Sequence, residues 1–366
     1  MNMSRRKSLA LLGGGTILAA GAAAGGFAAT RTPHAAMAPW SRAGTYHDPR
    51  KWALSYAILA PNPHNRQPWL VGLDGERTVT LWRDRVRDLP QTDPFQRQLT
   101  IGLGCFLEQM RIAASRKGVG VRLDLYPQGE EGPVAVATFE GSADPDPLFD
   151  AIPIRRSCKK PFSDRPVTPE TAARLGDHAT ILTEPGMVEA LRKLTWQAWL
   201  VEALTPRTLK ESVDLMRFGK AEINADPDGI RLGGPFLESL MLVGLLTRKS
   251  QADTSSTGFR RGVALYREML AATPAYAVLT SPTNTRADQI AAGRDWVRLN
   301  LAVNLAGLSL HPVSQALQEY PEMSGQYARA HALLAGDGGT VQMLGRLGYG
   351  PATPRSPRWP LETRLI

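Results

Sequence analysis

Two short segments carry the side chains best suited to chemistry in this sequence. An apolar helical run ends at Pro61, and a loop rich in amide side chains follows it as far as Trp69, where a strand-like run begins. Such a loop at the end of a helix can present several fixed donors to a planar polar ring. Residues 155–159 read Arg-Arg-Ser-Cys-Lys, a compact basic cluster suited to a phosphate group. Together the amide loop and the basic cluster predict a site for flavin mononucleotide (FMN).

The composition is that of an ordinary globular protein. Its 366 residues, 43% of them hydrophobic and 21% charged, can bury one large core or two smaller ones. The formal net charge is +9, but four basic residues lie before residue 37, where there is no acid. The remainder carries 39 basic against 34 acidic residues, a net charge of +5. No basic stripe with interleaved aromatic residues appears, so we expect no nucleic-acid partner.

The two cysteines do not form a redox or zinc motif. There is no CxxC pair and no cluster of His and Cys at zinc-ligand spacing, so no metal is expected. Cys105 sits in an apolar run and is predicted to be a small core residue. Cys158 lies inside the basic cluster, which could lower the pKa of its thiol. The interpretation of Cys158 as a spacer between phosphate ligands is favoured over that of a reactive thiol.

The N-terminus has the features of a targeting segment. Arg5 and Arg6 precede an Ala/Gly-rich apolar run at 9–29, the pattern of a twin-arginine export signal. Small residues at 35–36 or 37–38 could supply a cleavage site. The alternative is a membrane anchor, since 21 residues are just long enough to span; the glycines favour export. We therefore expect twin-arginine export machinery as a partner and a periplasmic or extracytoplasmic location, with membrane anchoring if the signal is retained.

Hydrophobic periodicity predicts two α+β units after a linker at 31–47. The first contains a helix at 48–59, a β-hairpin at 70–82, a helix at 95–117 and strands at 119–126 and 134–139. The second contains helices at 169–175, 186–202, 287–308 and 323–334, with strands at 276–280 and 341–347. In each unit a long helix with an apolar stripe precedes a strand-like run. The repeat suggests a fused pair in which one chain imitates a dimer.

These observations divide the chain into an export signal at 1–36, a first half at 44–150 and a second half at 151–366. Residues 206–261 mix helical and helix-breaking composition, which suggests a surface insertion or lid.

Taken together, the segments resemble the nitroreductase-like FMN flavoproteins, and most closely their tandem-fused, Acg-like branch. The family's P-S-x-x-N-x-Q-P-W loop matches residues 61–69, and its R-x-S-x-[KR] phosphate motif matches residues 155–159. Here the order of the two motifs is reversed. The resemblance implies an α+β, nitroreductase-like fold in which two half-units form a pseudo-dimer. Because the second half lacks amides at 180–185, it also implies a single composite site and one FMN per chain.

The resemblance assigns each site residue a role. Arg155 would bind the FMN phosphate with Arg355 or Arg358, Ser157 would bond the phosphate or the ribityl chain, and Lys159 would lie near flavin N1 and O2. The ring would be contacted from the other half by Pro61, Asn62 and Asn65, and the backbone N–H groups of Ser314 and Gln315 would lie near N5. Asn62 and Pro63 replace the family's loop serines, while Gln315 replaces a glycine and Ser314 an acidic residue.

Other polar and aromatic residues have plainer interpretations. Trp69 is expected in the core, His64 and His311 on the surface or in loops, and Arg66 facing solvent. Arg97 could reach the pocket from the start of its helix.

The predicted function is that of an FMN oxidoreductase. It would reduce a quinone, nitroaromatic or similar electrophile by ping-pong two-electron chemistry on the flavin, with no catalytic side chain assigned. A small-molecule donor and acceptor are implied, and no protein partner beyond the export machinery. The first alternative is an FMN-sequestering protein without turnover, because NAD(P)H is not expected outside the cytoplasm and residues 206–261 could block the ring. The second is an exported interaction protein with a decayed site.

Overall fold

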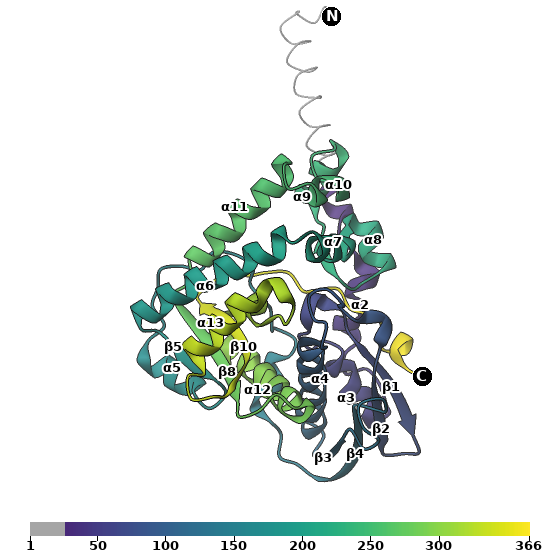
Figure 1. Ribbon diagram of the computed structural model, residues 1–366. Helices are drawn as coiled ribbons and strands as arrows, with labels where there is room; N and C mark the ends of the chain where they lie inside the picture. The colour runs from purple at the N-terminus through teal and green to yellow at the C-terminus, as the bar shows by residue number, and fades with distance from the viewer. Residues whose placement is uncertain (1–25) are drawn as a thin grey trace, which may run out of the picture.

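The computed structural model describes residues 26–366, so the twin-arginine pair and most of the apolar run lie outside the described residues. The chain folds around two antiparallel sheets of four strands each, with long helices between them (Figure 1). This confirms the predicted α+β fold class. No helix in the described part combines the length and the apolar character needed to cross a membrane.

The first sheet is built from residues 69–142, and its elements match the sequence expectations closely. Asp48 caps α3 by accepting from the backbone N–H groups of Arg50 and Lys51, with Pro49 at the first helical position. The order across the sheet is β1-β2-β4-β3. The elements are α3 (Pro49–Ala57), β1 (Trp69–Asp74), β2 (Thr78–Arg83), α4 (Arg97–Ser115), β3 (Val119–Leu125) and β4 (Ala135–Ser142).

The second sheet repeats this arrangement. Its order is β5-β8-β10-β9, and every neighbouring pair is antiparallel, as in the first sheet. Taken in chain order, β5, β8, β9 and β10 occupy the positions of β1, β2, β3 and β4. Both sheets place a long helix between their second and third strands. The elements are α5 (Pro169–Leu175), β5 (Thr180–Leu182), β8 (Ala275–Ser281), α12 (Arg286–Leu305), β9 (Ser309–Pro312) and β10 (Thr340–Gly348).

The two long helices, α4 and α12, pack directly against each other at the centre of the molecule (Figure 1). Their closest approach is at Gly104 and Gly293. A Cβ on Gly293 would lie 2.9 Å from the Gly104 Cα and would collide with the Ile101 carbonyl oxygen. The two glycines therefore allow backbone-to-backbone contact where the halves meet.

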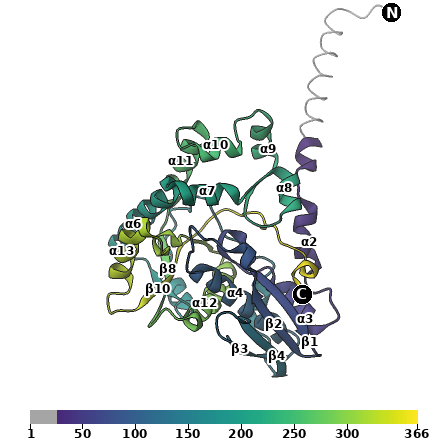
Figure 2. The same cartoon turned by 45° about the vertical axis from the view of Figure 1, so that its right-hand side comes forward.

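Segments inserted into the second half form an upper layer of helices (Figures 1 and 2). Eight elements separate β5 from β8, among them a small parallel pair, β6 and β7, and residues 206–261 lie within this segment. They are α6 (Pro185–Leu204), α7 (Pro206–Asp214), β6 (Met216–Phe218), α8 (Gly219–Ala225), β7 (Ile230–Leu232), α9 (Pro235–Leu242), α10 (Arg248–Ala252) and α11 (Thr257–Ala271). A further helix, α13 (Ser324–Leu334), precedes β10.

Two sequence expectations are wrong. Part of the expected linker at 31–47 forms α2 (His34–Arg42), in which Ala36 and Trp40 are buried. Its proline and small residues concealed a helix that tertiary packing stabilises. Residues 180–182, which the sequence comparison of the two halves placed opposite the amide loop, form the edge strand β5, which pairs with β8.

Candidate functional site

The loop after α3 is held in an unusual backbone conformation. His64, Asn65 and Gln67 all have positive φ angles, of 47°, 55° and 52°, a region that side chains other than glycine seldom adopt. Asn62 stabilises the loop, because its Oδ1 accepts from the Gln67 N–H at 2.7 Å and its Nδ2 donates to the Ala60 carbonyl at 3.1 Å. Such strain persists only where surrounding contacts fix it, which is typical of ligand-binding segments.

Neighbouring glycine and aromatic residues position this loop. It packs on α4 at Gly102, where an added Cβ would lie 3.1 Å from both the Asn62 Cβ and the Pro63 Cδ. Pro61 is half-buried at the end of α3. Trp69 is fully buried against Phe106, as expected for a core residue.

The amide side chains of the loop bind the C-terminal tail and the insertion. Asn65 Nδ2 donates to the Pro357 carbonyl at 3.1 Å, and its Oδ1 accepts from the Arg358 guanidinium. Gln67 Nε2 donates to the Pro227 carbonyl at 2.7 Å. Gln67 Oε1 accepts from the Trp359 N–H at 2.9 Å. The loop is thus a meeting point of three segments that are far apart in the sequence.

Arg155 and Arg358 converge on the same end of α3. Arg155 Nη2 and Arg358 Nη2 both donate to the Leu59 carbonyl, at 3.1 and 3.0 Å, and both side chains are almost fully buried. Because Asn65 also bonds Arg358, the amide loop of the first half and the basic segment of the second half lie together. This is the proximity that the composite site requires.

Two further arginines complete a four-arginine cluster, defined here as Arg155, Arg156, Arg355 and Arg358. The guanidinium groups of Arg156, Arg355 and Arg358 lie 5.2, 5.2 and 5.7 Å from the ring centroid of Trp40 in α2. Cation–π attraction accounts for this arrangement. Trp40 lies in a segment whose composition predicts a linker, so nothing in the sequence marks it as a site residue.

The four-arginine cluster carries uncompensated positive charge. Among residues 26–366, no carboxylate lies within 4.0 Å of these guanidinium groups. Burial, together with the neighbouring charge of Arg156, lowers the pKa of Arg155 to about 10. The pKa of Arg358 is pushed well below its usual value by burial and by Arg155 and Arg156. Buried charges are normally paired, so this arrangement favours binding of an anion.

Ser157 and Cys158 run alongside β9. Ser157 forms a parallel bridge with Leu310, and the Cys158 N–H donates to the Leu310 carbonyl at 3.2 Å. Cys158 is buried, and Gly350 passes so close that a Cβ there would lie 2.9 Å from the Cys158 Sγ. The buried position fits the spacer interpretation of Cys158. Cys105 is also buried, as expected.

A second group of titratable side chains gathers near Lys159, which is exposed. Burial, together with the charges of Lys159 and Arg66, lowers the pKa of His64 to about 4. Burial also holds the pKa of His311 well below its usual value, with Arg346 and Lys159 contributing. His311 is buried in β9, so the expectation of a surface position is wrong, while His64 is half-buried.

Glu202 of α6 belongs to the same group and was missed in the sequence. Burial raises the pKa of its carboxyl to about 7, against the lowering effects of a Gln318 hydrogen bond and the Lys159 charge. Gln318 Nε2 donates to Glu202 Oε2 at 2.8 Å. A signal was available, since Glu202 is an acid within the otherwise apolar helix end 198–204.

Ser314 and Gln315 belong to a short 3-10 helix after β9, Ser314–Leu317. The Ser314 Oγ donates to the Leu344 carbonyl at 3.3 Å, so its hydroxyl faces the sheet. Gln315 forms a hydrogen bond that lowers the pKa of Glu202. Arg97 supports this segment by donating to the Leu317 carbonyl at 2.7 Å.

Arg66 does not face solvent, contrary to expectation. Its Nη1 lies 2.9 Å from Asp228 Oδ2, and the same buried carboxylate binds Arg87 and Arg217. Asp228 belongs to the insertion, so this ion-pair group ties the insertion to the amide loop. Arg231 adds a link to the C-terminal tail by donating to the Arg355 carbonyl at 3.2 Å.

Several buried polar atoms beside these groups have no partner in the described part of the chain. They are Arg358 Nε, His311 Nδ1 and Gln318 Oε1. Such atoms are costly unless a ligand or water satisfies them. Two surface clefts of about 540 and 600 Å³ open elsewhere, and none of the ten predicted site residues lines either of them.

Comparison with known proteins points to nitroreductases. The chain is 31% identical over 124 residues to "Putative NAD(P)H nitroreductase acg" of Mycobacterium tuberculosis, which covers 32% of this chain and 36% of that relative. It is 24% identical over 343 residues to "Putative NAD(P)H nitroreductase Rv3131" of the same organism, covering 84% and 91%. The chain thus spans about a third of the first relative. No family model matches the chain.

Two solved structures show weaker similarity. The FMN-dependent nitroreductase NfnB from Mycobacterium smegmatis, in complex with NADPH, has a TM-score of 0.37 at 19% identity, covering 58% of this chain and 94% of that one. A nitroreductase-like family protein from Bacillus cereus has a TM-score of 0.32 at 14% identity, covering 62% and 98%. The fold described above rests on this chain's own strand order and pairing.

Proposed function

We propose that this protein is an FMN-dependent oxidoreductase of the nitroreductase type. It would pass two electrons from a small-molecule donor to a quinone, a nitroaromatic or a similar electrophile. The observation that carries this proposal is the four-arginine cluster, which is free of carboxylates among the described residues and lies against Asn65 of the other half. A phosphate monoester matches it, because guanidinium groups bind phosphate oxygens in a fixed fork geometry.

The residues present fit the parts of FMN. Arg155 and Arg358 would hold the phosphate, and Ser157 would contact the phosphate or the ribityl chain. Lys159 would lie at the N1 and O2 edge of the ring, where a cation raises the reduction potential. The unpartnered Arg358 Nε supports the fit at the phosphate end. When bound, the flavin supplies the two-electron chemistry, while the protein binds, orients and tunes it.

We further propose that the chain is a fused pair of half-units with one working site. The matching strand orders of the two sheets and the central α4–α12 contact support this proposal. Residues 180–185, expected at the position of the amide loop, instead form β5 and the start of α6. The segment before β5, residues 176–179, takes the position of the amide loop and also contains no amide side chain. One FMN per chain is therefore expected.

The identity of the donor and the location of the protein belong to the same proposal. The names of both mycobacterial relatives specify NAD(P)H, which makes NADPH and NADH the first donors to test. The twin-arginine pair supports export, where a different donor would be needed.

The alternative is FMN sequestration without turnover. It is favoured by the way the insertion is fixed over the amide loop, through Asp228 with Arg66 and through Pro227 with Gln67. A segment bound in this way could exclude substrates from the ring.

The test begins with the absorbance of the purified full chain near 450 nm and the amount of FMN per chain. We expect one FMN per chain. Anaerobic mixing with NADPH, or photoreduction, is then followed by rapid mixing with a quinone or a nitroaromatic. Rapid reoxidation by the electrophile supports the oxidoreductase, and a reduced flavin inert to both electrophiles supports sequestration. A folded protein that neither retains nor binds FMN would overturn both.

A further inference from the structure

Helix α9 and the turn after it expose an apolar surface. Phe236, Leu242, Val243 and Leu245 are 72%, 75%, 67% and 64% exposed. They lie within ten residues of one another, and we refer to them as the α9 surface. Isolated exposed apolar residues are common, but four large ones within ten residues of sequence are unusual and indicate an interaction surface.

Helix α9 buries its charge and exposes part of its apolar surface. Its one charged residue, Glu238, is buried, where Oε2 pairs with Arg31 at 3.4 Å and Oε1 accepts from the Gly234 N–H at 3.1 Å. Phe236 and Leu242 are exposed, while Leu237, Leu240 and Met241 are half-buried. The exposed apolar side chains need an apolar environment on the outer face of the helix.

The N-terminal segment joins the folded body at the same place. Residues 26–30 are helical and lie next to α8 and α9 (Figures 1 and 2). Lys220 of α8 donates to the Thr30 carbonyl at 3.0 Å, and the next residue, Arg31, pairs with Glu238 of α9. The preceding sequence, residues 9–25, is apolar and follows three basic residues. A stretch suited to lipid thus leads directly to the α9 surface.

The structure also indicates whether a peptidase could remove the N-terminal segment at the predicted cleavage positions. One predicted cleavage position is Ala36, which is 1% exposed within α2. Its N–H donates to Asn224 at 3.1 Å, and its carbonyl accepts from the Arg358 N–H at 2.9 Å. A peptidase needs an accessible, extended segment, which the docked α2 does not offer.

Basic residues border the α9 surface. Lys249 of α10 and Arg260 and Arg261 of α11 are exposed, whereas Asp253 is the one exposed acid between residues 235 and 261. Arg248 is also exposed, but Glu222 of α8 neutralises its charge in an ion pair at 2.9 Å. This charge pattern complements anionic lipid headgroups.

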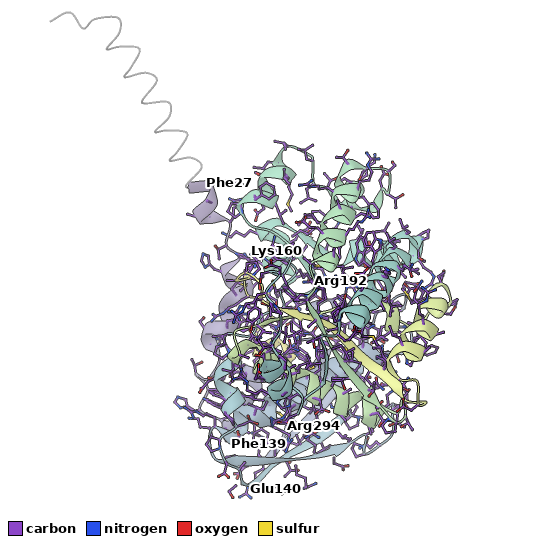
Figure 3. All side chains as sticks on the ribbon, turned by 90° about the vertical axis from the view of Figure 1, so that its left-hand side faces the viewer. Phe27, Phe139, Glu140, Lys160, Arg192 and Arg294 are labelled. Carbon is purple, nitrogen blue, oxygen red and sulfur yellow. The ribbon has the colours of Figure 1, made fainter. Side chains whose placement is uncertain are left out.

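We propose that the α9 surface rests on a lipid bilayer, with residues 1–25 retained as a second attachment to the same membrane. Two weak attachments acting together give stable membrane binding where one is marginal. The proposal is independent of the flavin, and it places the α9–α11 end of the molecule against the membrane. The hairpin of β3 and β4, which carries Phe139 and Glu140, lies at the opposite end from Phe27 (Figure 3).

The test uses the full chain and a polarity-sensitive fluorophore at one introduced cysteine. Both native cysteines are buried, so labelling of Leu242→Cys will be selective. Added vesicles of phosphatidylcholine and phosphatidylglycerol should produce a several-fold rise and a blue shift in emission. The matched control is Glu140→Cys, an exposed position at the far end, where no change is expected. Adding Phe236→Ser and Leu245→Ser to the Leu242→Cys protein should abolish most of the response.

Three other outcomes would contradict the proposed membrane contact in part or in full. Vesicle binding without a change at position 242 would mean attachment through residues 1–25 alone. A response at 242 that appears without vesicles and grows with protein concentration would mean a protein partner or self-association. The intact mass of the membrane-associated protein reports on retention, and a mass starting after residue 36 or 38 would refute it.

Discussion

At the scale of single residues, the most unusual feature is the four-arginine cluster. Its arginines donate to backbone carbonyls, and three of them surround the ring of Trp40. Arg155 and Arg358 satisfy part of their hydrogen bonding at Leu59 and Ala60. Their charges remain unneutralised among the described residues. This pattern is costly for folding alone, and it is explained if an anionic ligand completes it.

Replacing Arg155 should weaken FMN binding. Arg155→Ala removes a charged donor from the phosphate end, and we expect a loss of roughly 2–4 kcal/mol in binding free energy, measured by fluorescence titration of flavin. Because Arg155 is buried, Arg355→Ala, at a half-buried position, serves as a second variant with less effect on folding. Arg122→Ala, at an exposed ion pair with Glu140, is the control. Unchanged flavin affinity in both cluster variants would contradict the assignment.

Glu202 should make stability depend on pH. The pKa of its carboxyl rises from the usual 4.5 to about 7 in the folded protein, so the folded state binds a proton that the unfolded state releases. Stability is then lost as pH rises from 4.5 to 7, by roughly 3 kcal/mol from this group. His64 and His311 act in the opposite direction, because the pKa of each is lowered.

The comparison of wild type with Glu202→Gln isolates this contribution. Urea unfolding is measured at several pH values and at matched flavin content. Between about pH 5 and about pH 7, the variant should lose less stability than wild type, because this range lies between the usual pKa of Glu202 and its pKa in the folded protein. Parallel pH profiles for the two proteins would show that the Glu202 carboxyl is already ionised at low pH.

At the scale of elements, the contact of α4 with α12 depends on glycine. Gly293→Ala would drive a methyl group into the Ile101 carbonyl and the Gly104 backbone. We expect a loss of about 1–3 kcal/mol in the free energy of unfolding, measured as a lower urea midpoint with an unchanged m-value. The control is Gly262→Ala in α11, where nothing lies within 4 Å of the added Cβ. There, higher helix propensity should stabilise by up to about 1 kcal/mol. Equal effects at both positions would argue against close packing of the halves.

Elements with long, regular hydrophobic patterns could be predicted from the sequence. The helices α3, α4 and α12 and the strands β1, β2 and β10 begin and end within a few residues of the expected positions. The helix α2 could not be predicted, because its stability comes from contacts with α8 and the C-terminal tail rather than from its own composition. The short strands β5 and β9 were missed for the same reason.

The candidate site shows the same division. The basic segment at 155–159 and the loop at 61–69 were identifiable because their residue types are unusual at that density. Trp40 and Asp228 were not, since each acquires its role only when a distant element folds against it. Glu202 had a signal, as an acid in an apolar helix end, but its partner Gln318 comes from a distant segment. A single sequence specifies residue types and spacing, but it does not show which distant side chains will contact a residue in the folded protein.

At the scale of the whole molecule, the two sheets share one strand order but differ in what surrounds them. The first half is compact, and the second carries the inserted helices and the C-terminal tail. The insertion binds the first half through Asp228 and Arg66, while the last strand-like residues bind it through Leu365 and Val71. Both additions of the second half are therefore anchored on the first.

The docking of α2 has a consequence for how the protein is made. Trp40 donates to the Ser356 carbonyl at 2.8 Å, across 316 residues of sequence. Contacts this distant along the chain close late and slowly. The docking site of α2 cannot be complete until residue 356 has left the ribosome, and a nascent chain truncated before residue 356 should leave α2 without its binding surface.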